Sequence, residues 1–426
     1  MKGMLDLNDK HNFAGYIEYS SNQYFCTITD YIVKMFYKES PINHDEYDAE
    51  DNKEEYIFGF DEKDCPFSVL AVNLKTDIFA SRIPYHFSTP VVIRGKQRLT
   101  DLSYFDGIEF FGETVNKVFD PRQAVEHSKF STKVEDMMLK FRPDSDYSKN
   151  FGIDINGQKA EIGYSIYRSF NLAEQRNEDG SISLGALNSS IRIKFENSQS
   201  LEMLKRYYVV FSNFLIFLTG RQNVDFGVKI FQKNNNDLYF HTADCFFQKN
   251  NSDTYNGKML NTIQANSLGD TLPELFTMFT NEKTAPFLRY LPENNKMANY
   301  ITAADVLNIC TAFEIAYGLD ETDKKDNIVQ NMKIPEFGKS ILSRRMWFLF
   351  EKATNTTSEE ALLQNKKSVA SFVMLRDDII HNGNMVWGDS GRFAMTLIKI
   401  LYVNIFLRAK MDKEKAIRIA DTKWRT

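Results

Sequence analysis

Residues 302–318, "TAADVLNICTAFEIAYG", mark the point at which the sequence changes from strand patterns to helix patterns. Thr302 and Asp305 have the spacing of a capping box, in which each side chain accepts a hydrogen bond from the other residue's backbone N–H. The apolar residues that follow recur at intervals of three and four, the period of a buried helix face: Val306, Cys310, Phe313 and Tyr317. We therefore expect a helix that runs from this cap to Gly318.

Three further helices are expected after this one. Their approximate ranges are 339–353, Ser358 to the motif "RDDIIHNG" at 376–383, and 391–411. Asn382-Gly383 closes the middle helix, since glycine commonly terminates helices. Four helices joined by short connections predict a small helical bundle.

The preceding part of the chain favours strands. Short β-branched and aromatic runs such as "FSVLAVNL" (67–74) are separated by Asp, Lys, Pro and Gly, and Asn156-Gly157 indicates a hairpin. The run "YYVVFSNFLIFL" (207–218) is shorter than the roughly 20 residues of a membrane span, so it predicts a buried helix that ends at Gly220. The predicted fold is α+β, with a β-rich domain at 1–285 and an all-α bundle at 286–426.

Charge and cysteine content narrow the class of protein. The net charge is −5, with 31 Lys and Arg against 40 Asp and Glu up to residue 285, and 21 against 17 after it. This balance disfavours broad nonspecific nucleic-acid binding but permits an RNA-facing C-terminal domain. Four widely spaced cysteines and the lack of a signal-peptide pattern predict a cytoplasmic protein that does not enter a membrane.

The motif at 376–383 holds the candidate catalytic residues Arg376, Asp377 and His381. His381 is the only histidine after residue 285, and the sequence has no zinc-ligand spacing and no glycine-rich nucleotide-binding loop. We therefore expect neither a metal nor a cofactor. On a regular helix, two residues five positions apart differ by about 140° around the axis and by about 7.5 Å along it. Arg376 and His381 of one chain therefore cannot easily reach the same atom. Two copies facing each other across a two-fold axis would bring arginines and histidines into one groove.

These residue types suit RNA cleavage without a metal. The 2′-hydroxyl must lose a proton as it attacks phosphorus, and histidine exchanges protons near neutral pH. The transition state gathers negative charge, which a guanidinium meets with two parallel hydrogen bonds. Asp377 would orient Arg376 or His381. The products would be a 2′,3′-cyclic phosphate and a 5′-hydroxyl end.

Two further residues are candidates for support, and each has a plainer interpretation. Glu314 lies in the middle of the first bundle helix and could orient Arg376 across the bundle; Asn382 lies beside His381. An Arg–Asp pair at a helix end is usually solvated surface, a histidine in a last turn suits the helix dipole, and glutamate simply favours helix. The motif alone leaves both interpretations open.

The C-terminal part resembles the HEPN superfamily through "VLNICTAFEIAYG" and "VMLRDDIIHNG". HEPN ribonucleases have R-x(4–6)-H, commonly with Asn, Asp or His after the arginine, which matches Arg376, Asp377 and His381. The N-terminal part resembles the β-rich domain of ApeA-type anti-phage proteins through "FAGYIEYSSNQYFCTI", "YIFGF" and "FSNFLIFLTGRQNV".

This resemblance implies an abortive-infection endoribonuclease that forms a homodimer through its HEPN domain. Its substrate would be tRNA or another RNA of translation. The N-terminal domain would sense or regulate, with a phage protein as the trigger. Two alternatives stay open: a non-catalytic HEPN module that binds RNA or nucleotide, and a protein-interaction module in which the acidic N-terminal half docks a protein partner.

Overall fold

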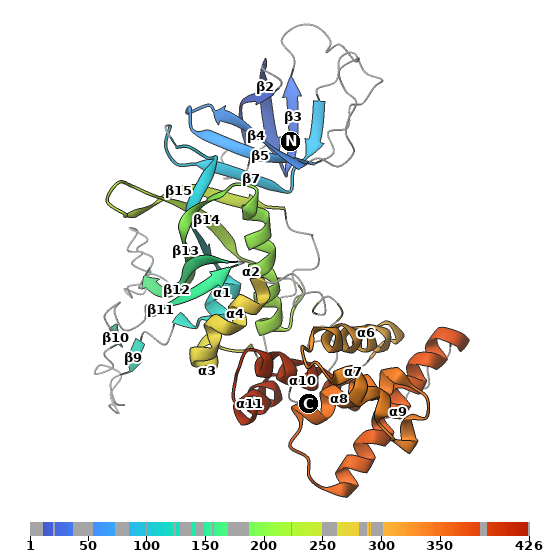
Figure 1. Ribbon diagram of the computed structural model, residues 1–426. Helices are drawn as coiled ribbons and strands as arrows, with labels where there is room; N and C mark the ends of the chain where they lie inside the picture. The colour runs from blue at the N-terminus through green and yellow to red at the C-terminus, as the bar shows by residue number, and fades with distance from the viewer. Residues whose placement is uncertain are drawn as a thin grey trace, which may run out of the picture.

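The computed structural model describes most of the chain. The described strands all lie before residue 250, with helices among and after them up to Thr280, and the described residues from 301 onward are mainly helical (Figure 1). The described residues are 12–19, 22–36, 54–72, 85–98, 100–121, 125–127, 139–141, 149–155, 157–168, 187–222, 224–248, 262–280, 288, 290, 301–383 and 390–424. The predicted boundary at residue 285 and Asn156 of the predicted hairpin lie outside them.

The strands are β1 (Phe13–Tyr19), β2 (Asn22–Thr29), β3 (Ile32–Phe36), β4 (Glu54–Asp61), β5 (Pro66–Val72), β6 (Tyr85–Ser88), β7 (Val91–Gly95), β8 (Tyr104–Phe111), β9 (Val125–His127), β10 (Leu139–Phe141), β11 (Lys149–Ile155), β12 (Gln158–Arg168), β13 (Leu187–Ser200), β14 (Gly227–Lys233) and β15 (Tyr239–Phe247). The helices are α1 (Glu113–Val118), α2 (Met203–Thr219), α3 (Ala265–Leu268), α4 (Leu272–Thr280), α6 (Ala303–Leu319), α7 (Lys325–Asn331), α8 (Ile341–Ala353), α9 (Glu359–Asn382), α10 (Ser390–Arg408) and α11 (Lys413–Lys423).

Thirteen of these strands form one antiparallel sheet, and β9 and β10 form a separate pair. The order across the large sheet is β11-β12-β13-β8-β14-β15-β7-β5-β4-β1-β2-β3-β6. β8 lies between β13 and β14, so residues about 80 to 130 positions apart pair directly, for example Ile108 with both Ile193 and Ile230. The fold is thus mixed α and β, with a large antiparallel sheet and several helices in its C-terminal part.

Strands β1 to β7 enclose a small core of their own. Its centre includes Ile17, Cys26, Val33 and Phe67, all inaccessible to solvent. Phe67 lies across the backbones of β1 and β4, and a Cβ atom on Gly59 would lie 2.7 Å from its ring. Glycine at that position is therefore required for the ring to pack against the strand.

Helix α2 covers one face of the sheet (Figure 1). Phe211 stacks on Phe110 of β8 with ring centroids 3.9 Å apart, and Tyr208 stacks on Phe247 of β15 at 3.8 Å. The helix ends at Gly220, whose φ of 67° is the left-handed conformation typical of a C-cap. The prediction of a buried helix over 207–218 is confirmed, and among the described residues no helix is long and apolar enough to cross a membrane.

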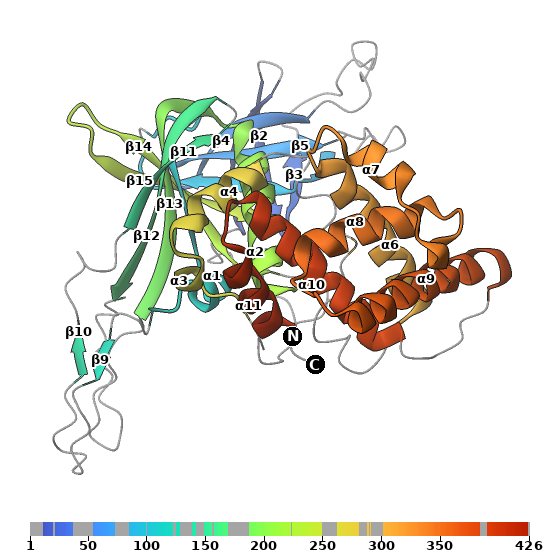
Figure 2. The same ribbon diagram turned by 60° about the horizontal axis from the view of Figure 1, so that its bottom comes forward.

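The C-terminal helices are drawn in Figure 2. The four predicted ones, α6, α8, α9 and α10, begin and end within three residues of their predicted bounds. The Thr302–Asp305 capping box is present at the start of α6, Ser358 caps the start of α9, and Gly383 ends α9 with a φ of 66°. The helices α7 and α11 were not predicted. They form at 325–331 and 413–423, where the sequence offers only short apolar patterns.

The end of α2 is joined to the C-terminal helices by packed rings and hydrogen bonds. Phe217 of α2 stacks on Tyr402 of α10 at 4.4 Å, and the Tyr402 hydroxyl donates to the Phe217 carbonyl at 2.8 Å. Lys423 of α11, only 2% exposed, donates from Nζ to the Leu218 carbonyl at 3.0 Å. One hydrophobic core therefore runs from the large sheet through α2 into the helices.

Lys423→Met is expected to remove a pH dependence of stability. Burial lowers the pKa of the Lys423 ammonium well below its ordinary value, so the unfolded chain binds one more proton between that lowered pKa and the ordinary value of about 10.4. The free energy of unfolding contributed by this residue therefore rises with pH in that window, by up to about 1.4 kcal/mol per pH unit.

Urea unfolding between pH 7 and 10 should give a shallower dependence of the unfolding free energy on pH for Lys423→Met than for the wild type. The exposed control Lys367→Met should keep the wild-type slope, and parallel curves for Lys423→Met would contradict the assignment.

Candidate functional site

The motif predicted from the sequence occupies the last two turns of α9. The helix runs without a break to Asn382, and the Gly383 N–H donates to the Ile379 carbonyl at 3.2 Å. Because the helix is regular up to its cap, the directions of Arg376 and His381 follow from helical geometry.

Arg376 belongs to the side of α9 that packs on the other helices. It lies three and seven residues after the buried Val373 and Val369, which places it on their face. The Arg376 Nη1 atom is 2.8 Å from Asp377 Oδ1, and the Arg376 side chain is 33% exposed. The guanidinium is thus held by its neighbour and still open to an anion from solvent.

His381 lies on the outer side of the same helix. It is exposed, as is Met374 seven residues before it, at 66%. Arg376 and His381 are separated by about 140° around the helix axis. Within one chain, their side chains therefore point in different directions.

Helix α6 brings a buried thiol and a glutamate to the Arg376 side of α9. Burial raises the pKa of Cys310 to about 12; Arg376 acts to lower it, and Glu314 and Asp377 act to raise it further. The three charged side chains therefore lie within electrostatic range of the Cys310 thiol, which stays protonated at neutral pH. The sequence analysis did not predict that Cys310 lies near Arg376.

The two supporting candidates have other partners in the structure. Glu314 Oε1 is 3.8 Å from Arg345 Nη1 of α8, so its ion-pair partner is a different arginine from Arg376. The Asn382 side-chain amide donates to Asp378 Oδ1 at 3.5 Å. Glu314 is a charged residue beside a buried apolar stripe, a pattern that signals an ion pair across a helix interface but does not identify the partner.

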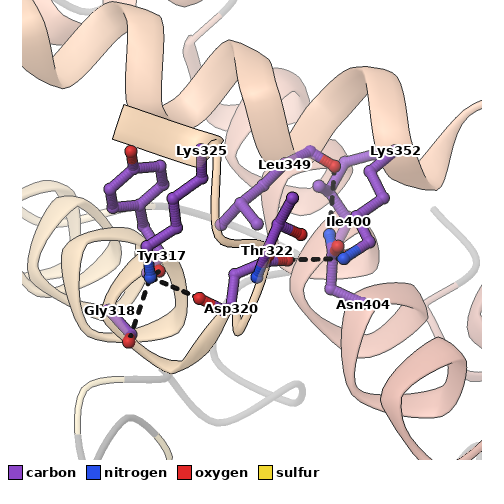
Figure 3. A network of polar contacts seen from close by, with 9 residues as sticks. All are labelled: Tyr317, Gly318, Asp320, Thr322, Lys325, Leu349, Lys352, Ile400 and Asn404. Atoms are coloured by element: carbon purple, nitrogen blue, oxygen red, sulfur yellow. Dashed lines mark hydrogen bonds and ion pairs between the residues drawn. The ribbon is translucent and has the colours of Figure 1, made fainter. Parts of the chain in front are cut away.

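A polar network fixes the helices around α6 (Figure 3). Lys325 Nζ donates to the carbonyls of Tyr317 at 3.0 Å, Gly318 at 3.3 Å and Asp320. Lys352 of α8 pairs with Asp320. Burial would raise the pKa of Asp320, but hydrogen bonds from Lys352 and Thr322 bring it below its ordinary value. The end of α6 is thus tied to α8.

A second contact in this network ties α8 to α10. Asn404 of α10 donates to the Leu349 carbonyl at 3.0 Å and to the Ile400 carbonyl at 2.9 Å (Figure 3). The helices against which α9 packs are therefore linked to one another by polar contacts as well as by their core.

The described residues contain no cluster of three or more His, Cys, Asp or Glu side chains arranged to hold a metal ion. The end of α9 presents a guanidinium, an imidazole and a carboxylate. A guanidinium can bind a phosphate, and an imidazole can exchange protons.

Comparisons with protein-family models, with curated proteins and with solved structures found no match for this chain.

Proposed function

We propose that this protein is a metal-independent endoribonuclease and that residues 286–426 form a HEPN-type ribonuclease domain. The observation that supports this most is the pair at the end of α9: Arg376 is restrained by Asp377 at 2.8 Å, and His381 is exposed one and a half turns later. Both side chains are reachable from solvent, as a long RNA substrate requires.

The active form in this proposal is a homodimer. Arg376 and His381 point to different sides of α9, so a second copy is needed to place a histidine opposite each arginine. The outer side of α9 has two exposed apolar side chains, Leu363 and Met374. A second copy whose Arg376 side contacts this outer side would cover them and place an arginine beside His381.

The chemistry follows from this arrangement. His381 takes the proton of the ribose 2′-hydroxyl, whose oxygen then bonds to phosphorus. The bond from phosphorus to the 5′-oxygen breaks, and that oxygen takes its proton from water. Arg376 neutralises the charge on the non-bridging oxygens, and Asp377 orients Arg376.

Cleavage of labelled RNA in excess EDTA tests the proposal. The purified wild-type chain should produce 2′,3′-cyclic phosphate and 5′-hydroxyl ends, and His381→Ala should lower the rate roughly 10²–10⁴-fold because general acid–base catalysis is lost. The ends can be identified by whether polynucleotide kinase labels them without prior phosphatase treatment.

Controls separate catalysis from folding and from contamination. Ser371→Ala, an exposed change on the same helix, should retain the wild-type rate. If EDTA abolishes cleavage, or if His381→Ala cleaves as fast as the wild type, the nuclease proposal is wrong. If the wild-type chain binds RNA but makes no new ends, the alternative of a non-catalytic RNA-binding module is favoured instead.

The biological part of the proposal rests on the resemblance to ApeA-type proteins. In this proposal, the nuclease cleaves tRNA or another translation RNA during phage infection. The β-rich half keeps the enzyme silent until a phage protein is sensed. The joining of α2 to α10 and α11 supports such coupling, because a change in the sheet can reach the helices through packed rings.

A further inference from the structure

Four aromatic side chains form a continuous row across neighbouring strands of the sheet. Phe60 of β4 pairs in register with Tyr16 of β1, Tyr16 with Phe25 of β2, and Phe25 with Phe36 of β3. The Tyr16 and Phe25 ring centroids are 5.7 Å apart, and those of Phe25 and Phe36 are 5.8 Å apart. We call these four residues the aromatic row.

The aromatic row is exposed although its strands already have a complete core. Its members are between 39% and 47% accessible to solvent. On the opposite face of the same strands, Ile17, Cys26 and Val33 are wholly buried. An antiparallel sheet with one packed face normally presents polar residues on the other. Folding therefore does not explain why four aromatic residues stand on the solvent side.

Other apolar residues extend this surface. Phe58 of β4 and Ile32 of β3 have the same strand parity as the aromatic row and are each 42% exposed. This face thus holds six of the fourteen large exposed apolar side chains among the described residues. Apolar side chains gathered on one surface mark an interaction site, whereas isolated ones do not.

The surrounding charge identifies the class of partner. Residues 12–36 and 54–64, which contain β1 to β4, have seven acidic side chains and two basic ones among the described positions. The acidic residues are Glu18, Asp30, Glu54, Glu55, Asp61, Glu62 and Asp64; the basic ones are Lys34 and Lys63. Three of the acids are ion-paired within the chain, Asp61 (only 4% exposed) with Arg94, Glu54 with Lys205 and Asp64 with Arg98. The other four acids still outnumber the two lysines. An RNA backbone would be repelled, and so would the same face of a second copy.

We propose that the aromatic row docks a cationic protein segment, one in which apolar side chains are flanked by Lys or Arg. The apolar side chains would cover the four rings, and the basic ones would pair with carboxylates such as Glu18, which lies two residues beyond Tyr16 on the same face of β1. Aromatic residues commonly anchor such interfaces. This inference does not depend on RNA cleavage.

Peptide binding to the full-length chain tests the proposal. The probes are short fluorescent peptides of alternating Leu and Lys, of alternating Leu and Glu, and of alternating Ser and Lys, measured by anisotropy. The Leu–Lys peptide should bind the wild type at least about tenfold more tightly than the other two. The double variant Phe25→Thr/Phe36→Thr should lose that advantage, since threonine keeps the strand propensity but removes the rings.

Matched controls make each outcome decisive. Leu238→Thr, at a 63% exposed apolar residue in the β14–β15 connection, should bind the Leu–Lys peptide like the wild type. Circular dichroism should show the double variant folded; if it is not, Phe25→Thr alone is used. Equal binding by wild type and variant would overturn the proposal. So would row-dependent binding of an oligouridine, or row-dependent self-association in sedimentation, which would assign the surface to RNA or to a second copy.

Discussion

An equal mixture of Arg376→Ala and His381→Ala chains is expected to recover about one quarter of wild-type RNA cleavage, although each variant alone is at least about 100-fold slower. Random pairing makes about half of the dimers mixed. In a mixed dimer, one side has lost both residues and the other keeps an intact arginine and histidine from different copies. This result would show that the two residues act across the dimer.

The mixture is best made by co-expressing the two variants with different tags and purifying through both. The doubly purified sample contains only mixed dimers, so its activity should approach about half that of the wild type. Arg418→Ala, which removes an exposed arginine on α11, serves as the matched control and should cleave normally. A mixture as inactive as its components would contradict the shared site, and full activity of the single variants would contradict the nuclease itself.

Phe217→Ala is expected to destabilise the C-terminal helices by about 3–5 kcal/mol although it alters α2. Phe217 is wholly buried, stacks on Tyr402 of α10 and lies 5.4 Å from the ring of Phe406. Removing it opens a cavity at the join between the large sheet and the helices. All three tryptophans lie after residue 340, so their fluorescence reports the unfolding of the helical part.

Phe67→Ala is the matched comparison, because Phe67 is equally buried but belongs to the separate core of β1 to β7. In urea titrations, the tryptophan transition should shift to a markedly lower midpoint for Phe217→Ala than for Phe67→Ala. If the two variants shift the midpoint of the tryptophan transition equally, the two cores unfold together. If Phe217→Ala leaves this midpoint unchanged, the contact between α2 and α10 does not stabilise the helices.

The features predicted correctly from the sequence are those with local causes. The capping box at Thr302 and Asp305 and the terminating glycines at 220 and 383 each act within one helical turn. The position of the motif at the end of a helix followed from Gly383 alone. These signals do not depend on the rest of the fold.

The features that could not be predicted depend on residues far apart in the chain. The aromatic row joins positions 16, 25, 36 and 60, which become neighbours only once the strand register is set. Lys423 resembles a surface lysine in sequence, yet it is buried against the Leu218 carbonyl. Glu314 was expected near Arg376, but the identity of its ion-pair partner, Arg345, depends on how α6 and α8 pack.

The separation of Arg376 and His381 around α9 has a consequence for the living cell. If each cleavage event requires two chains, the amount of active enzyme rises with the square of chain abundance while most chains are single. A cell that keeps the protein scarce would then hold it silent by dilution alone. Doubling its synthesis would raise RNA damage about fourfold, so control of expression would act as a safety threshold ahead of any trigger.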